Sequence, residues 1–162
     1  MSVSRRILAM YRRPRLVVAD LLGDGTREDR VLAYLIAGCA LMFLAQLPRL
    51  AREAHLTEGD LNMMMGGALL GWLMIAPLAF YLIAGISHVI ALIFGGQGSF
   101  YTARLALFWA LLAAAPIFLL LGLVLGFIGA GVQSTLVGSL WLLCFVAFWG
   151  TGLWVTERRV AA

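Results

Sequence analysis

The stretch ARLALFWALLAAAPIFLLLGLVLGFI, residues Ala103–Ile128, decides the fold of this chain. Its single charged residue is Arg104, near the start, and almost all the other side chains are apolar. A helix rises about 1.5 Å per residue, so about 20 apolar residues cross a hydrocarbon core of about 30 Å. The stretch therefore predicts a helix that spans a membrane.

Three further apolar stretches lie at Val31–Leu47, Leu61–Phe94 and Thr135–Thr156. Hydrophobic residues make up 63% of the chain and charged residues 12%, whereas a soluble domain is about half apolar and a quarter charged. We predict an all-α, polytopic transmembrane bundle with four spans. A fifth span stays open as an alternative, because Leu61–Phe94 is too long for one upright crossing.

We expect three regions, namely a basic amphipathic segment (1–30), the helical bundle (31–156) and a short tail (157–162). The first 30 residues lack the order of a cleaved secretory signal, so Val31–Leu47 is expected to remain as the first span. All 12 cationic residues are arginine, a usage typical of a GC-rich bacterial genome. Ten arginines fall on the side of the amino terminus and only Arg49 and Arg52 on the other side. The positive-inside rule therefore predicts a multi-pass protein of the bacterial inner membrane, with both termini in the cytosol.

The N-terminal segment interleaves arginines with apolar residues on both sides of Pro14. Proline lacks a donor and restricts the residue before it, which predicts two short helices. A basic amphipathic segment of this kind lies in the membrane interface and favours anionic headgroups. The candidate basic patch consists of Arg5, Arg6, Arg12, Arg13 and Arg15. Topogenic charge alone explains these arginines, and a docking surface for a lipid or a partner is the alternative.

Local signals predict the ends of the spans. We expect a cap at Thr26, an end of the first span at Pro48, a capping box of Thr57 with Asp60, a kink at Pro77 and a cap at Ser99. Pairs of glycines four residues apart let membrane helices approach closely. We expect Gly67 with Gly71, and Gly122 with Gly126, to pack within the monomer, with a homo-oligomer as the alternative.

An ionisable side chain inside lipid is costly, so it is a functional hypothesis. Only His88, beside Ser87, qualifies, and the spans contain no Asp or Glu between Asn62 and Thr156. A proton relay needs a second buried partner such as a carboxylate. We therefore expect His88 to bond a backbone carbonyl, Ser87 or another helix.

We expect no enzyme activity, no metal and no cofactor. The absence of lysine excludes Schiff-base chemistry and a Walker-type phosphate loop. Cys39 and Cys144 are expected to pack as small apolar residues. The positive-inside rule already accounts for where the arginines lie, so they do not indicate a nucleic-acid site, and we expect no nucleic-acid partner.

The segment FGGQGSFYTARLALFWALLAAAP, Phe94–Pro116, resembles the signature of the Yip-one domain family, Ypt/Rab-interacting membrane proteins with bacterial relatives. YRRPRLVVADLL, Tyr11–Leu22, is similar to the family's N-terminal proline-containing segment, and Trp141 in the last span is also similarly placed. The resemblance implies a bundle of four or five spans with cytosolic termini. Eukaryotic members bind small prenylated GTPases through a long cytosolic region that residues 1–30 do not resemble, so no binding or catalytic residue is carried over.

Together these features favour a non-enzymatic scaffold or accessory subunit that organises lipid or membrane-protein partners. The alternative is a small-solute or ion permease, with Ser87, His88, Gln133 and the Pro77 kink near its pathway. An intramembrane enzyme is the third and weakest hypothesis, because no acid pair, Ser–His pair or metal set supports it.

Overall fold

The structure is a computed structural model that describes residues 3–158. All regular elements in this range are helices. They are α1 (Val3–Met10), α2 (Pro14–Gly23), α3 (Glu28–Thr57), α4 (Leu61–Leu70), η1 (Gly71–Ile75), α5 (Ala76–Ile93), α6 (Phe100–Phe127) and α7 (Val132–Arg158). Among the described residues, four helical rods are long and apolar enough to cross a membrane, namely α3, α4–η1–α5, α6 and α7. The predicted four-span helical bundle is confirmed, while Arg159 and the rest of the predicted tail lie outside the described residues.

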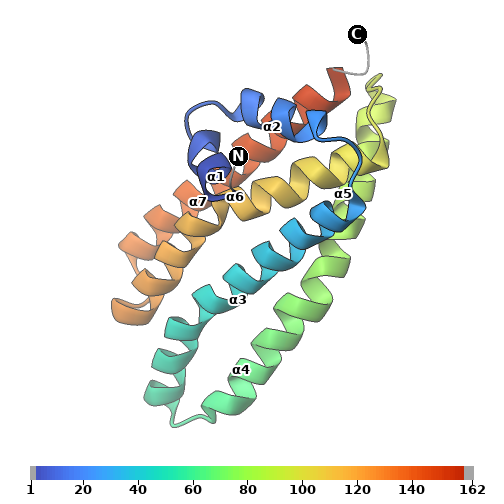
Figure 1. Cartoon of the computed structure of the whole chain (residues 1–162). Helices are drawn as coiled ribbons and strands as arrows, with labels where there is room; N and C mark the ends of the chain where they lie inside the picture. Colours follow the sequence, from blue (N-terminus) through green and yellow to red (C-terminus); the bar gives the residue numbers. More distant parts are fainter. Residues whose placement is uncertain (1–2, 159–162) are drawn as a thin grey trace.

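Helix α6 forms the centre of the bundle and packs between α3 and α7, with further contacts to α5 and α1 (Figure 1). Its side chains from Leu105 to Ala115 are all buried. By contrast, the α4–η1–α5 rod and α7 bury few of their residues and carry many exposed apolar side chains. These two helices therefore supply much of the surface that lipid chains would cover.

The turns between the helices gather at two ends of the bundle, the hairpin end and the opposite end. The hairpin end consists of the turn at 24–27, the α5–α6 turn at 94–99 and the last turn of α7, and it lies on the side of α2. The opposite end consists of the turns at 58–60 and 128–131. Consecutive spans run up and down between these ends (Figure 1).

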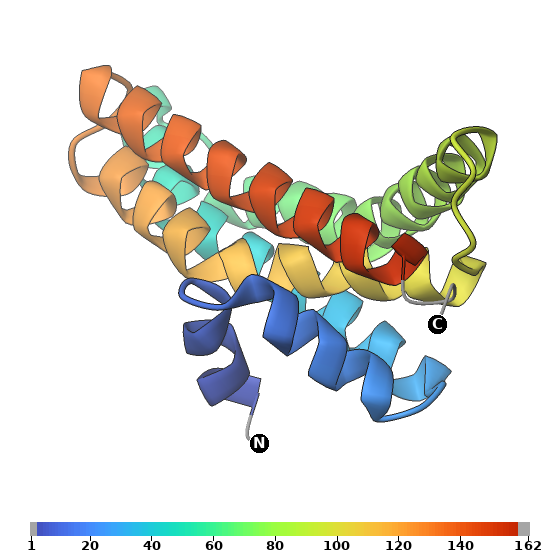
Figure 2. The same cartoon turned by 90° about the horizontal axis from the view of Figure 1, so that it is seen from above.

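The predicted break at Pro14 is confirmed, and α1 and α2 form an N-terminal hairpin beside α6 and α7 (Figure 2). The Tyr11 hydroxyl at its tip donates to the Ala113 carbonyl at 2.9 Å. Ala113 lies in the turn before Pro116, where the missing proline N–H disturbs the helical hydrogen bonds. The Tyr11 ring also meets Phe148 of α7 edge-on, with 5.1 Å between the ring centroids. The apolar face of the hairpin, formed by Met10, Val17, Val18 and Leu21, is thus buried in protein.

The prediction that the first span ends at Pro48 is wrong, because α3 continues through Pro48 to Thr57. Tertiary contacts hold this extension in place. A Cβ on Gly126 would overlap Pro48, so α6 lies directly against this part of α3. Arg52 then donates to the Gly126 and Phe127 carbonyls at the end of α6, at 3.4 and 3.3 Å. These bonds satisfy carbonyls that the end of a helix leaves free.

The caps around α3 and α4 also differ from the predictions. Thr57 does not begin the second span, because it ends α3 and donates its hydroxyl to the Glu53 carbonyl. The cap of α4 is Asp60 alone, which accepts the Asn62 N–H at 2.9 Å. Thr26 is not the cap of α3 either, since Arg27 occupies that position and gives its N–H to the Tyr101 hydroxyl at 3.0 Å.

Ser99 is confirmed as the cap of α6. Its side chain and that of Thr102 form a reciprocal capping box. The second span is one continuous rod in which the π-helical segment η1 ends just before Pro77. Pro77 has no N–H to donate, and the wider π-helical turn at this point accommodates the missing hydrogen bond.

Candidate functional site

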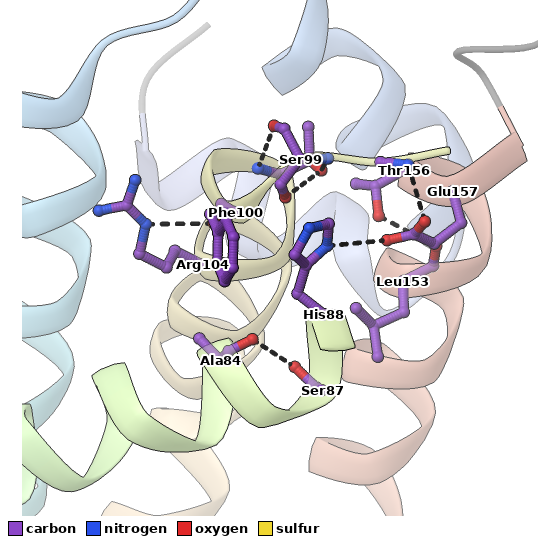
Figure 3. Close-up of polar contacts among 11 residues, drawn as sticks. Ala84, Ser87, His88, Ser99, Phe100, Arg104, Leu153, Thr156 and Glu157 are labelled. Carbon is purple, nitrogen blue, oxygen red and sulfur yellow. Dashed lines mark hydrogen bonds and ion pairs between the residues drawn. The ribbon is translucent and has the colours of Figure 1, made fainter. Parts of the chain in front are cut away.

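The buried ionisable group predicted in the second span, His88, faces a carboxylate from α7 (Figure 3). His88 Nδ1 lies 3.9 Å from Glu157 Oε1, and the two side chains are 5% and 11% exposed. Neither of these two atoms has a hydrogen-bond partner. Ser87 is not the partner of His88, because its hydroxyl donates to the Ala84 carbonyl at 2.8 Å.

Glu157 also holds the α5–α6 turn. Its Oε2 accepts the Gly98 N–H at 2.8 Å. A Cβ on Gly96 or Gly98 would overlap the Glu157 carboxylate, and at Gly96 it would also lie 2.9 Å from the Ala91 carbonyl oxygen, so the carboxylate packs directly against the backbone of the turn. Gly95 has a φ of +81°, which side-chain-bearing residues rarely adopt.

The surroundings of His88 also include an aromatic ring and a charged pair from α6 and α3. The Phe100 ring contacts the imidazole in a tilted arrangement, with 4.3 Å between the ring centroids. Arg104, one turn further on, pairs with Glu28 at 2.6 Å. Arg104 also donates to the Phe100 carbonyl at 3.1 Å, so its charge is directed away from His88 (Figure 3).

A second ionic cluster ties the N-terminal hairpin to α3. Arg6 pairs with Asp20 at 2.8 Å and with Asp24 at 3.0 Å, and Arg30 pairs with the same Asp24 oxygen at 2.5 Å. Arg6 is only 8% exposed, which corrects its predicted place in the basic patch. Hydrogen bonds first from Arg6 and then from Arg30 hold the pKa of the Asp24 carboxyl below its ordinary value.

We expect the N-terminal hairpin to loosen only in acid. A lowered pKa in the folded state means that Asp24 adds stability above the ordinary aspartate range, and this contribution is lost as pH falls through the lowered value. Amide exchange of α1 between about pH 2 and 6 measures the transition. Asp24→Asn should lower protection above the transition and reduce its pH dependence, and the remaining ion pair of Arg6 with Asp20 accounts for what is left. Asp29→Asn, which removes an exposed carboxylate nearby, should leave the transition unchanged.

The remaining predicted arginines form an exposed surface on the hairpin, which we call the basic surface. Its members are Arg5, Arg12, Arg13 and Arg15. A cavity of about 510 Å³ is lined by Leu8, Ala9, Tyr11, Arg12 and Arg13. The Arg15 guanidinium lies 4.5 Å from the ring centroid of Trp154, near the end of α7.

The two predicted glycine pairs have different surroundings in the structure. Gly122 lies against the Ala45 backbone and Gly126 against Pro48, both across the α3–α6 interface. Gly67 and Gly71 have no atom within 4 Å of an added Cβ, so neither is a point of close helix approach in the monomer. Gln133 is exposed at the opposite end of the bundle, whereas His88 lies near the hairpin end, so the two residues do not line a common pathway.

The sequence pattern does not predict a role for Glu157, because it lies one residue beyond the end of the last apolar stretch. The signal that could have found it is topological. Four antiparallel spans bring the end of the last helix beside the end of the second, which is where His88 lies.

The fold and the site define the class of protein: a polytopic α-helical membrane bundle with an apolar centre and ionic contacts at its ends. Among the described residues, no group of three or more His, Cys, Asp or Glu is placed to hold a metal ion. Comparison of the chain with family models, with curated proteins and with solved structures gives no match. The resemblance to the Yip-one domain family therefore stays a prediction.

Proposed function

We propose that this protein is a non-enzymatic scaffold or accessory subunit of the bacterial inner membrane, of the Yip-one-like type. The N-terminal hairpin is its docking element, and anionic phospholipid headgroups are its first partners. A membrane-protein partner or a second copy of the chain would bind to the same hairpin. The arginine distribution supports an orientation with the hairpin end in the cytosol.

The observation that carries the proposal is the way the basic surface is held. Tyr11, on the α1–α2 turn, is bonded to Ala113, and Arg15 on α2 is stacked on Trp154. Arg12 and Arg13 are exposed between these two fixed points, beside the exposed apolar Leu8. Two guanidinium groups next to an apolar cavity match a phosphate with an acyl chain attached.

The rival function, a permease, receives less support from the same structure. The buried polar or charged side chains of the described residues are Arg6, Ser87, His88 and Thr156. All four belong to the hairpin end or to the turn next to it, whereas the centre of α6 is surrounded by apolar side chains. Solute flux into proteoliposomes that disappears in His88→Ala would favour the permease.

We expect Arg12→Gln with Arg13→Gln to weaken binding of an anionic phospholipid about 10- to 30-fold, because each arginine near the surface contributes about 1 kcal/mol. Native mass spectrometry of the detergent-solubilised protein, titrated with anionic or zwitterionic phospholipid of the same chain length, measures the effect. The control removes two charges outside the hairpin, Arg27→Gln with Arg49→Gln. Equal losses in both double variants, or equal binding of both lipids by the unmodified protein, would contradict the proposal.

A further inference from the structure

The end of α7 is held by a carboxylate whose charge needs compensation. Glu157 Oε2 accepts the Gly98 N–H at 2.8 Å, but Oε1 accepts no hydrogen bond. A carboxylate that is only 11% exposed is costly unless a positive charge lies near it. The question is which group supplies that charge.

Among the described side chains, the charged groups around the pair leave His88 as the source of that charge. From α6, Arg104 is paired with Glu28 of α3. From α2, Arg15 lies on the Trp154 ring. Among the described side chains, the nearest group to Oε1 that can become positive is therefore His88, whose Nδ1 is 3.9 Å away and has no other partner.

We propose that His88 and Glu157 form a proton-binding site, and that the bound proton fastens the end of α7 to the α5–α6 turn. With the proton on the imidazole, Nδ1–H faces Oε1 across 3.9 Å, and a small approach of the two side chains would form a charge-assisted hydrogen bond that gives both unpaired atoms a partner. When the proton leaves to solvent, Glu157 is a buried carboxylate with no positive ion-pair partner among the described side chains, and its bond to the Gly98 N–H is its remaining polar contact with the turn. The fastening is therefore complete at lower pH and weakens as pH rises through the titration of the pair.

The fastening extends to the N-terminal hairpin. Trp154 lies three residues before Glu157, on the same face of the last turns of α7. Its ring contacts the guanidinium of Arg15 in α2. Loss of the proton would thus loosen one of the two contacts that position the basic surface. This last link rests on the proposed function of the basic surface, whereas the proton site itself does not.

The chain offers a clean test, because it contains two histidines, His55 and His88. In His55→Gln the remaining histidine is His88, so NMR of isotope-labelled histidine in micelles follows its protonation alone. We expect Glu157→Gln, made in this background, to weaken proton binding at His88, because the opposite charge that favours the imidazolium is removed. The same midpoint with and without Glu157, or a His88 that stays neutral throughout, would overturn the proposal.

Amide exchange at Gly98 provides a second readout, with Gly131 as an internal reference. The Gly131 N–H is donated to the Ser134 hydroxyl at the opposite end, a partner that does not titrate in this range. We expect the protection of Gly98 relative to Gly131 to fall several-fold as pH rises through the His88 midpoint. In Glu157→Gln, whose amide oxygen can still accept the Gly98 N–H, the ratio should not depend on pH.

A constant ratio in the protein that retains Glu157 would show that the proton does not control the fastening. Binding of anionic phospholipid, measured on the same variants at low pH, reports on the basic surface separately. Failure of the proton site is thus distinguishable from failure of the proposed function.

Discussion

Gly122→Ala is expected to destabilise the bundle by about 3 kcal/mol, although it adds only one methyl group. Helices α3 and α6 approach so closely at Gly122 that a Cβ would overlap the backbone carbonyl of Ala45. A backbone cannot turn aside as a flexible side chain can, so one of the two helices must shift. The temperature at which the detergent-solubilised protein unfolds or aggregates measures the loss.

The matched control is Gly67→Ala, the same substitution in another apolar span. An added Cβ there has no atom within 4 Å. Alanine is the better helix former by about 1 kcal/mol, so this variant should be as stable as the unmodified protein or slightly more stable. If both variants lowered the unfolding temperature equally, the close α3–α6 packing described here would be wrong.

The glycine pairs also show what sequence spacing can and cannot predict. Both pairs have the spacing that favours close helix packing, but only Gly122 and Gly126 lie against another helix of the monomer. The spacing defines a small-residue face on a helix. Which neighbour covers that face depends on how the helices are arranged in space, and the sequence does not contain this information in a local form.

Most of the fold was predictable because each feature depends on residues close together in the chain. Apolar stretches of membrane-spanning length predicted the four rods, and Pro14 and Ser99 predicted a break and a cap. The predictions failed where distant contacts decide the outcome. Pro48 stays inside α3, since α6 packs against it and Arg52 extends the contact.

The candidate site was half predictable for the same reason. His88 stood out as an ionisable residue within an apolar stretch, but its partner Glu157 is 69 residues away in the sequence. Arg6 looked like the other arginines of the N-terminal segment, and only the fold shows that it is buried between Asp20 and Asp24. Charge composition predicted a basic surface, and tertiary contacts determined which arginines belong to it.

The central claim is that four helices cross the bilayer with the hairpin end in the cytosol, and single-cysteine labelling tests it most directly. Gln97 at the hairpin end and Gln133 at the opposite end are both exposed. Each would be replaced by cysteine in a background in which Cys39 and Cys144 are alanine, and an impermeant maleimide would be added to intact spheroplasts.

We predict that Gln133→Cys reacts in intact spheroplasts and that Gln97→Cys reacts only after the membrane is permeabilised. Equal reactivity of the two cysteines in intact spheroplasts would contradict the predicted crossings, and the reverse pattern would contradict the cytosolic placement of the hairpin end.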